Sequence, residues 1–275
     1  MDDTPARLRL PAPAHVRGPA GPWHPVRTAM ERTGVAVVHT TWGEWLPAAL
    51  TDAALRPLLG RDWQRYRRTA DPTVRHRFVA SRLALKCTAA AALGTDPGGL
   101  DLAYGLGGRP YLRGLDQIDV SLTHAGELIA VGVSRHGRIG VDTEPLARGL
   151  DSRRLGPYLC TAAELRALQA LPADARDDET LRLWTLKEAY SKAMGQGLRI
   201  GFTEFGFGRD GTRLLTPEGA AAAGHGQWVF ATHRVLDRHL LSVAAQDAGL
   251  DPSADIAVRT ALDEGIVGAV AELLG

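Results

Sequence analysis

Cysteine, net charge and long apolar runs are all scarce in this 275-residue sequence, and each scarcity excludes a class of protein. Two cysteines are too few for the disulfide framework of a small secreted domain, so we expect a reduced protein. A formal net charge of +1 is unlike the basic balance of most nucleic-acid-binding proteins. No stretch reaches the roughly 18 apolar residues of a membrane span, and the acidic start MDDTPARLRL lacks a secretory signal. We therefore expect a soluble, cytoplasmic protein that binds neither nucleic acid nor membrane.

Proline and apolar periodicity divide the rest of the chain. Six prolines fall within the first 25 residues, so we expect an extended or partly ordered arm over residues 1–33. Beyond it, a helix-then-hairpins plan appears in residues 34–144 and again in residues 145–275. This repeat predicts an α+β fold of two similar halves related by pseudo-two-fold symmetry, with the functional site at their interface. Strands are expected at 35–42, 100–104, 111–113, 118–123, 127–134 and 138–143, strand pairs within 201–215 and 228–246, and helices at 48–59, 73–93, 161–170, 178–194 and 252–274.

An acidic pair follows one of these strands. The segment IGVDTEPL, residues 139–146, is apolar until it reaches Asp142 and Glu144. Side chains of a strand alternate between its two faces, so these carboxylates point the same way. Alone, such a pair is more often a solvated strand end than a metal site.

A second segment, WTLKEAYSKAMGQGL at residues 184–198, has helical spacing. Trp184, Glu188 and Lys192 lie four residues apart on one stripe of that helix. If the stripe faces the acidic strand end, three carboxylates meet beside a lysine. Oxygen ligands of this kind suit Mg²⁺, which commonly also takes phosphate oxygens. Together the two segments predict a metal-assisted site for phosphoryl or diphosphate chemistry.

Basic residues concentrate between Arg61 and Lys86, where eight of them accompany two aspartates. Such a cluster is either a solvated helix face or the wall of a pocket for a polyanionic small molecule. Both interpretations remain open from the sequence. The GLGG run at 105–108 superficially resembles a phosphate loop, but a strand follows it, so we expect a hairpin turn.

The chain resembles 4′-phosphopantetheinyl transferases of the larger, monomeric, surfactin-synthetase-activating type. GVDTE (140–144) is similar to the family's G-[IV]-D-x-E segment, and WTLKEAYSKAMGQG (184–197) to its W-x-x-K-E-[AS]-x-x-K-x-x-G-x-G segment. GGRPYL (107–112) resembles the G-[KR]-P segment, and SLTHAG (121–126) stands where the family carries N-x-S-H-S. These segments occur in family order between about residues 77 and 200. The match departs from the family at SLTHAG, where serine replaces asparagine and alanine replaces the last serine.

The resemblance implies an enzyme of holo-[acyl-carrier-protein] synthase type. It would move the 4′-phosphopantetheine arm of coenzyme A onto a serine of an acyl, peptidyl or aryl carrier protein and release adenosine 3′,5′-bisphosphate. Asp142, Glu144 and Glu188 would hold Mg²⁺, with Mn²⁺ as an alternative, against the diphosphate. Glu188 would also accept the serine proton, and Lys192 and Lys187 would flank the diphosphate, Lys192 as the leaving-group contact.

The resemblance also assigns coenzyme A contacts. His124 would contact the 3′-phosphate, with Thr123 and Arg109 nearby. Further phosphate or adenine-side contacts would come from four basic residues of the cluster, Arg77, Lys86, Arg61 and Arg65. A carrier protein, usually acidic near its serine, would dock on residues 147–180, which include Arg153 and Arg154.

Two other functions compete with transfer. One is a Mg²⁺-dependent hydrolase of nucleotide diphosphates, which would need a water-activating base beyond the metal ligands. The other is a non-enzymatic module that binds coenzyme A or nucleic acid through the Arg61–Lys86 cluster. The hydrolase would release phosphopantetheine without a carrier, and the binding module would tolerate Glu188→Gln.

Overall fold

A computed structural model describes residues 8–51, 55–105, 107–195, 200–222 and 227–248, apart from the side chains of residues 49–51. The helix expected at 252–274 and the end of the 184–198 segment lie outside these residues. Among the helices that the structure does describe, none is long and apolar enough to cross a membrane.

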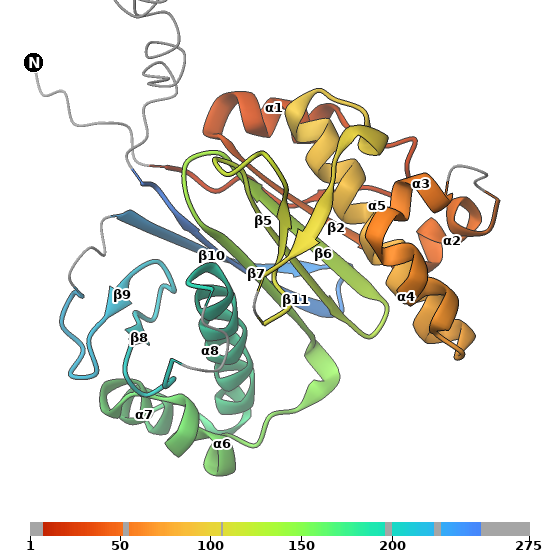
Figure 1. The fold of residues 1–275 in the computed structure, drawn as a ribbon. Coiled ribbons are helices and arrows are strands. Elements are labelled where there is room, and N and C mark those ends of the chain that lie inside the picture. The colour runs from red at the N-terminus through yellow and green to blue at the C-terminus, as the bar shows by residue number, and fades with distance from the viewer. Residues whose placement is uncertain (1–7, 52–54, 106, 196–199, 223–226, 249–275) are drawn as a thin grey trace, which may run out of the picture.

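Two sheets form the centre of the molecule (Figure 1). The first has the order β1 (Ala14–His15), β2 (Val35–Thr41), β6 (Leu128–Ser134) and β5 (Asp119–Ala125). The second has the order β10 (Trp228–Val235), β11 (His239–Gln246) and β7 (Ile139–Pro145). Two short hairpins stand apart, β3 (Leu102–Tyr104) with β4 (Pro110–Leu112) and β8 (Gly206–Phe207) with β9 (Leu214–Leu215). All these pairings are antiparallel except β1 with β2, and the β3–β4 pairing confirms the hairpin expected around GLGG.

Helices flank the two sheets separately (Figure 1). Beside the first sheet lie α1 (His24–Thr33), α2 (Trp42–Thr51), α3 (Leu55–Leu59), α4 (Trp63–Arg68) and α5 (Pro72–Leu93). Beside the second lie α6 (Ser152–Leu159), α7 (Ala162–Gln169) and α8 (Ala173–Ala193). Short 3-10 turns occupy Gly60–Asp62, Pro97–Gly99 and Leu146–Arg148. Helices and strands mixed in this way confirm the α+β class.

Apolar side chains gather in three cores. One joins α1 and α5 to the first sheet, and a second surrounds α8, β8 and β10. The third lies between the two sheets, where Ile139 and Val141 of β7 pack with Val35 and Val37 of β2. Each group of helices therefore has its own core, and the sheets share one.

The expected N-terminal arm is wrong for residues 24–33, which form α1. Two of its side chains, Val26 and Met30, are buried in the first core. Pro25 lies in the first turn, where a missing N–H costs nothing, and Gly34 ends the helix in the left-handed conformation. The helix expected at 48–59 is likewise two helices, α2 and α3, and α4 and α6 were not anticipated.

Helix α8 lies directly on β7 at Gly140. A Cβ atom at this position would overlap the carbonyl oxygen of Ala189 and lie 2.7 Å from the backbone nitrogen of Ala193. Glycine is therefore required for the close approach of helix and strand. Residues 140, 142 and 144 alternate onto the same face of β7, so Asp142 and Glu144 face the helix as predicted.

Candidate active site

The first feature of the site is a seam between β5 (residues 119–123) and β7 (residues 139–142). β7 pairs with β11 along one edge only, and β5 side chains satisfy amides on its other edge. The Asp119 carboxylate accepts a hydrogen bond from the Ile139 amide at 2.7 Å, and the Ser121 hydroxyl accepts one from the Val141 amide at 3.1 Å. Serine in place of the family's asparagine thus still has a partner across the seam.

An acid–lysine group lies at the end of this seam. The Lys192 ammonium donates to the Asp142 carboxylate at 2.6 Å and to the Thr123 hydroxyl at 3.1 Å. That hydroxyl in turn donates to the same Asp142 oxygen at 3.2 Å. Residues of β5, β7 and α8 thus meet at one point.

Glu188 lies one helical turn before Lys192 and is partly buried. Removal from water raises the pKa of Glu188, and the negative charge of Asp142 raises it further. Burial also raises the pKa of Asp142, against the opposing charge of Lys192. A carboxylate whose pKa lies above its ordinary value is better matched to accept a proton near neutral pH.

The carboxylates fit a divalent cation in part. Asp142 Oδ2 is buried without a hydrogen-bond partner, and the negative charges of Asp142 and Glu188 repel each other. A cation between the two carboxylates would offset both costs. Glu144 is paired with Arg148, whose guanidinium lies 5.4 Å from the ring centre of Trp184. Within the described ranges, no three His, Cys, Asp or Glu side chains gather closely enough to hold a metal. The described side chains therefore do not form the predicted three-carboxylate cluster, and Glu144 is paired with Arg148.

A cavity of about 290 Å³ adjoins the acid–lysine group. Its walls include Thr123, His124 and Lys192, three of the predicted site residues, together with Arg82 and Tyr104. Partial removal from water and the positive charges of Lys192, Arg82 and Arg77 lower the pKa of His124. The electrostatic character of this cavity is therefore positive, which suits an anionic ligand.

Sequence reasoning missed the network that holds Arg82 beside this cavity. The Arg82 Nε donates to the buried Asp62 carboxylate at 3.2 Å, and the Tyr104 hydroxyl donates to the same oxygen. The Arg82 guanidinium also lies 5.1 Å from the centre of the Tyr104 ring. A signal was present, because Asp62 is one of only two acids among the eight bases of the cluster.

The rest of the basic cluster is dispersed. Lys86, placed with the phosphate contacts, is buried and donates to the Leu58 carbonyl at 2.7 Å. The Arg61 Nε lies 3.7 Å from an Asp101 oxygen. The Arg65 guanidinium lies 4.9 Å from the centre of the Phe78 ring, and the Arg77 guanidinium lies 5.7 Å from the centre of the Trp42 ring. Of the four assigned residues, only Arg77 has a charge that acts on His124. The structure thus corrects the assignment of Lys86 and does not bring Arg61 or Arg65 to the cavity.

Lys187 lies on a different face of α8 from Lys192. Its ammonium is 0% exposed and contacts a Glu164 oxygen at 2.6 Å. Three carbonyl oxygens complete its surroundings, those of Leu159, Phe202 and Phe205 at 2.6–2.8 Å. Its assignment beside the diphosphate is therefore wrong, because every donor position of the ammonium is used inside the second core.

Arg109 is also placed differently from the assignment. Its Nη2 contacts an Asp119 oxygen at 2.6 Å and the Ile139 carbonyl at 2.7 Å, and its Nη1 donates to the Lys192 carbonyl. Its guanidinium is thus engaged by the protein, and the side chain is absent from the walls of the cavity beside His124. These contacts differ from the predicted place of Arg109 among the coenzyme A contacts near the 3′-phosphate.

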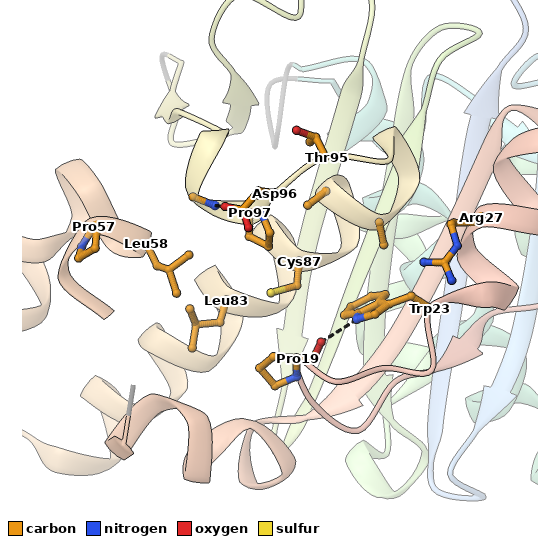
Figure 2. Close-up of a pocket in the computed structure, with 13 residues that line it drawn as sticks. Pro19, Trp23, Arg27, Pro57, Leu58, Leu83, Cys87, Thr95, Asp96 and Pro97 are labelled. Atoms are coloured by element: carbon orange, nitrogen blue, oxygen red, sulfur yellow. Dashed lines mark hydrogen bonds between the residues drawn. The ribbon is translucent and has the colours of Figure 1, made fainter. Parts of the chain in front are cut away.

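A larger cavity of about 510 Å³ lies elsewhere, among α1, α3 and α5 (Figure 2). Trp23, Leu83 and Cys87 line it, and the Trp23 indole already donates to the Pro19 carbonyl at 2.7 Å. It contains none of the residues of the acid–lysine group. The candidate catalytic side chains therefore lie at the smaller cavity.

Comparison with known proteins shows which family the chain resembles. Residues 138–244 match the model of the 4′-phosphopantetheinyl transferase superfamily. The matched residues include β7 and α8. The resemblance to this superfamily is thereby confirmed.

Three relatives illustrate the match. The 4′-phosphopantetheinyl transferase of Bacillus subtilis is 28% identical over 47% of this chain and 57% of its own. The 4′-phosphopantetheinyl transferase HetI of Nostoc sp. is 33% identical over 46% and 55%. A phosphopantetheinyl transferase of Thraustochytrium sp. is 26% identical over 76% of this chain and 78% of its own. The chain thus spans little more than half the length of the Bacillus and Nostoc relatives.

Proposed function

We propose that this chain transfers the 4′-phosphopantetheine group of coenzyme A to a serine of an acyl, peptidyl or aryl carrier protein. The observation that carries the proposal is the meeting of Asp142, Glu188 and Lys192 beside a positive cavity that contains His124. An anion can enter such a cavity while a partly buried carboxylate waits beside it to take a proton. The names of the relatives point to the same reaction.

The proposed reaction assigns one task to each side chain. Glu188 accepts the proton of the carrier serine as its oxygen bonds to the β-phosphorus, and the bond to adenosine 3′,5′-bisphosphate breaks. Lys192 offsets the negative charge that grows on the leaving phosphate. Asp142 orients the Lys192 ammonium through their 2.6 Å contact. Asp142 and Glu188 would hold Mg²⁺, and Glu144 would lie beside Asp142 on β7. Bound Mg²⁺ would neutralise diphosphate charge.

The proposal includes two halves of the chain, with the boundary moved from residue 144 to the start of β7, because β7 pairs with β11 in the second sheet. The separate cores around α5 and α8, and the site at the seam between the sheets, support two halves with the site at their interface. A monomeric enzyme of the surfactin-synthetase-activating type, acting in the cytoplasm, remains part of this proposal.

The test is a mass measurement. The protein is incubated with Mg²⁺, coenzyme A and an apo carrier protein, and the carrier is expected to gain the mass of one phosphopantetheine. Phosphopantetheine released from coenzyme A without a carrier would instead indicate the hydrolase. A carrier of unchanged mass, with intact coenzyme A that still binds, would indicate the binding module.

Arg82 is expected to contribute to recognition of the 3′-phosphate. Replacing it with methionine removes a positive charge from the cavity, so the KM for coenzyme A should rise by about tenfold. The KM for 3′-dephospho-coenzyme A should change much less, a difference that a folding defect would not produce. The matched control is Arg67→Met, which removes an exposed charge from α4. Equal rises for both substrates would contradict this role.

Helix α6 is the proposed docking surface for the carrier. It presents Arg153, Arg154 and Tyr158, whose side chain is 79% exposed, and such a basic and aromatic surface complements an acidic partner. Changing both arginines to glutamate should raise the KM for the carrier about tenfold and leave coenzyme A binding unchanged. The control Arg27→Glu/Arg32→Glu makes the same change of net charge on α1. An effect equal to that of the control would rule out α6.

A further inference from the structure

The last turn of α8 ends with two arginines at its carbonyl groups. The Arg109 Nη1 donates to the Lys192 carbonyl, and the Arg138 Nη1 donates to the Met194 carbonyl at 3.0 Å. The final carbonyls of a helix lack partners within the helix, and positive charge is favourable there. Both arginines therefore stabilise this end of the helix, but only one of them reaches further.

Arg109 also holds the edge of β7. Its Nη2 donates to the Ile139 carbonyl at 2.7 Å and contacts Asp119 Oδ2 at 2.6 Å. The same Asp119 oxygen accepts the Ile139 amide at 2.7 Å. The pair of side chains thus binds both backbone polar groups of one strand residue. A guanidinium suits this task because its donors form a rigid, planar fork.

The two backbone segments that Arg109 binds, in β7 and in α8, also bear the two partners of the acid–lysine contact. Asp142 follows Ile139 by three residues along β7, and the carbonyl bound on α8 belongs to Lys192 itself. One guanidinium therefore joins the backbone segments that bring the Lys192 ammonium to the Asp142 carboxylate. The side chains of Arg109 and Asp119 are 23% and 26% exposed, so water competes little for these bonds.

We propose that Arg109 is a positioning residue of the active site, which fixes the end of α8 against the edge of β7 without contacting coenzyme A. This inference rests on the proposed transferase function. It gives the arginine of the GRP segment a task that is internal to the protein.

The test compares kcat and KM in Arg109→Ala. Loss of positioning should lower kcat about 10- to 100-fold, since displacement of a catalytic group by about 1 Å can cost that much. The KM for coenzyme A should stay within about threefold of the original value. A raised KM with kcat preserved would show a substrate contact and overturn the inference, as would two unchanged constants.

Two further variants separate positioning from stability. Arg138→Ala removes the other arginine from the same helix end, and its Tm should fall as in Arg109→Ala while kcat is retained. An equal loss of kcat in Arg138→Ala would show that Arg109 acts only by capping the helix. Asp119→Asn keeps an acceptor for the Ile139 amide but loses the ion pair, so its kcat should fall part of the way. This variant carries the test if Arg109→Ala does not fold.

The outcome for the original protein keeps the two proposals distinct. No transfer to any carrier by the unchanged chain refutes the proposed function. Transfer by the unchanged chain with full kcat in both Arg109→Ala and Asp119→Asn refutes only the positioning role.

Discussion

Glu188→Gln is expected to reduce transfer to a carrier protein by about a thousandfold, with the chain still folded. Glutamine keeps the shape of the side chain but cannot accept the serine proton, a task worth about 10²- to 10⁴-fold in rate. It also removes one of the two carboxylates proposed to hold a cation. The measurement is the initial rate of carrier modification at saturating coenzyme A and Mg²⁺.

The same variant should gain stability, and the sign follows from the pKa. Because the pKa of Glu188 is raised in the folded protein by burial and by Asp142, ionisation is harder there than in the unfolded chain. Ionisation of Glu188 thus destabilises the fold as the pH rises from the ordinary range of a glutamate through the raised pKa. Tm should therefore be higher in Glu188→Gln than in the original protein at neutral pH, with a smaller difference near pH 4.

Glu179→Gln is the control, since it makes the same substitution on the same helix. Glu179 forms an ion pair with Arg182 and lies away from the acid–lysine group. Its transfer rate should remain close to that of the original chain. Full transfer activity in Glu188→Gln would contradict the role of Glu188 as the base.

Lys187→Met is expected to lower the free energy of unfolding by about 3–5 kcal/mol, the usual cost of removing one partner of a buried ion pair. The lysine is fully buried, and its loss leaves the Glu164 carboxylate and three carbonyls without a cation. Urea unfolding followed by circular dichroism measures the change. For the fraction that folds, the KM for coenzyme A should stay unchanged.

Two companion variants sharpen this prediction. Adding Glu164→Gln to Lys187→Met removes the orphaned charge and should restore part of the lost stability. Lys192→Met, on the partly exposed face of the same helix, should instead cause a large loss of rate. A stable Lys187→Met protein with a raised KM for coenzyme A would indicate that Lys187 contacts the substrate after all.

The contrast between these lysines could have been read from the sequence. Five residues along a helix correspond to a rotation of about 140°, so Lys187 and Lys192 cannot share a face. The strand periodicity of β7 and the stripe of Glu188 and Lys192 were predictable for the same reason, because they depend on local geometry alone. The family resemblance then suggested the proposed chemistry, but it also assigned Lys187 to the wrong role.

Contacts between distant segments were not predictable in this way. Arg82 reaches its aspartate 20 residues away, and Arg109 reaches a carbonyl 83 residues away. No periodicity connects such positions, so the sequence did not indicate that Asp119 and backbone carbonyls hold the Arg109 guanidinium. The proline-rich start misled for another reason. Proline is tolerated in the first turn of a helix, and the burial of Val26 and Met30 stabilises α1 there.

The contact at Gly140 sets a limit on how this site can vary. Where main chain touches main chain, the spacing between helix and strand no longer depends on the size of any side chain around it. Apolar residues elsewhere in the second core can then be exchanged for others of similar volume with little effect on the geometry of the reacting groups. Because Gly140 has no side chain, the positions of the proposed reacting groups should depend little on conservative substitutions in the second core.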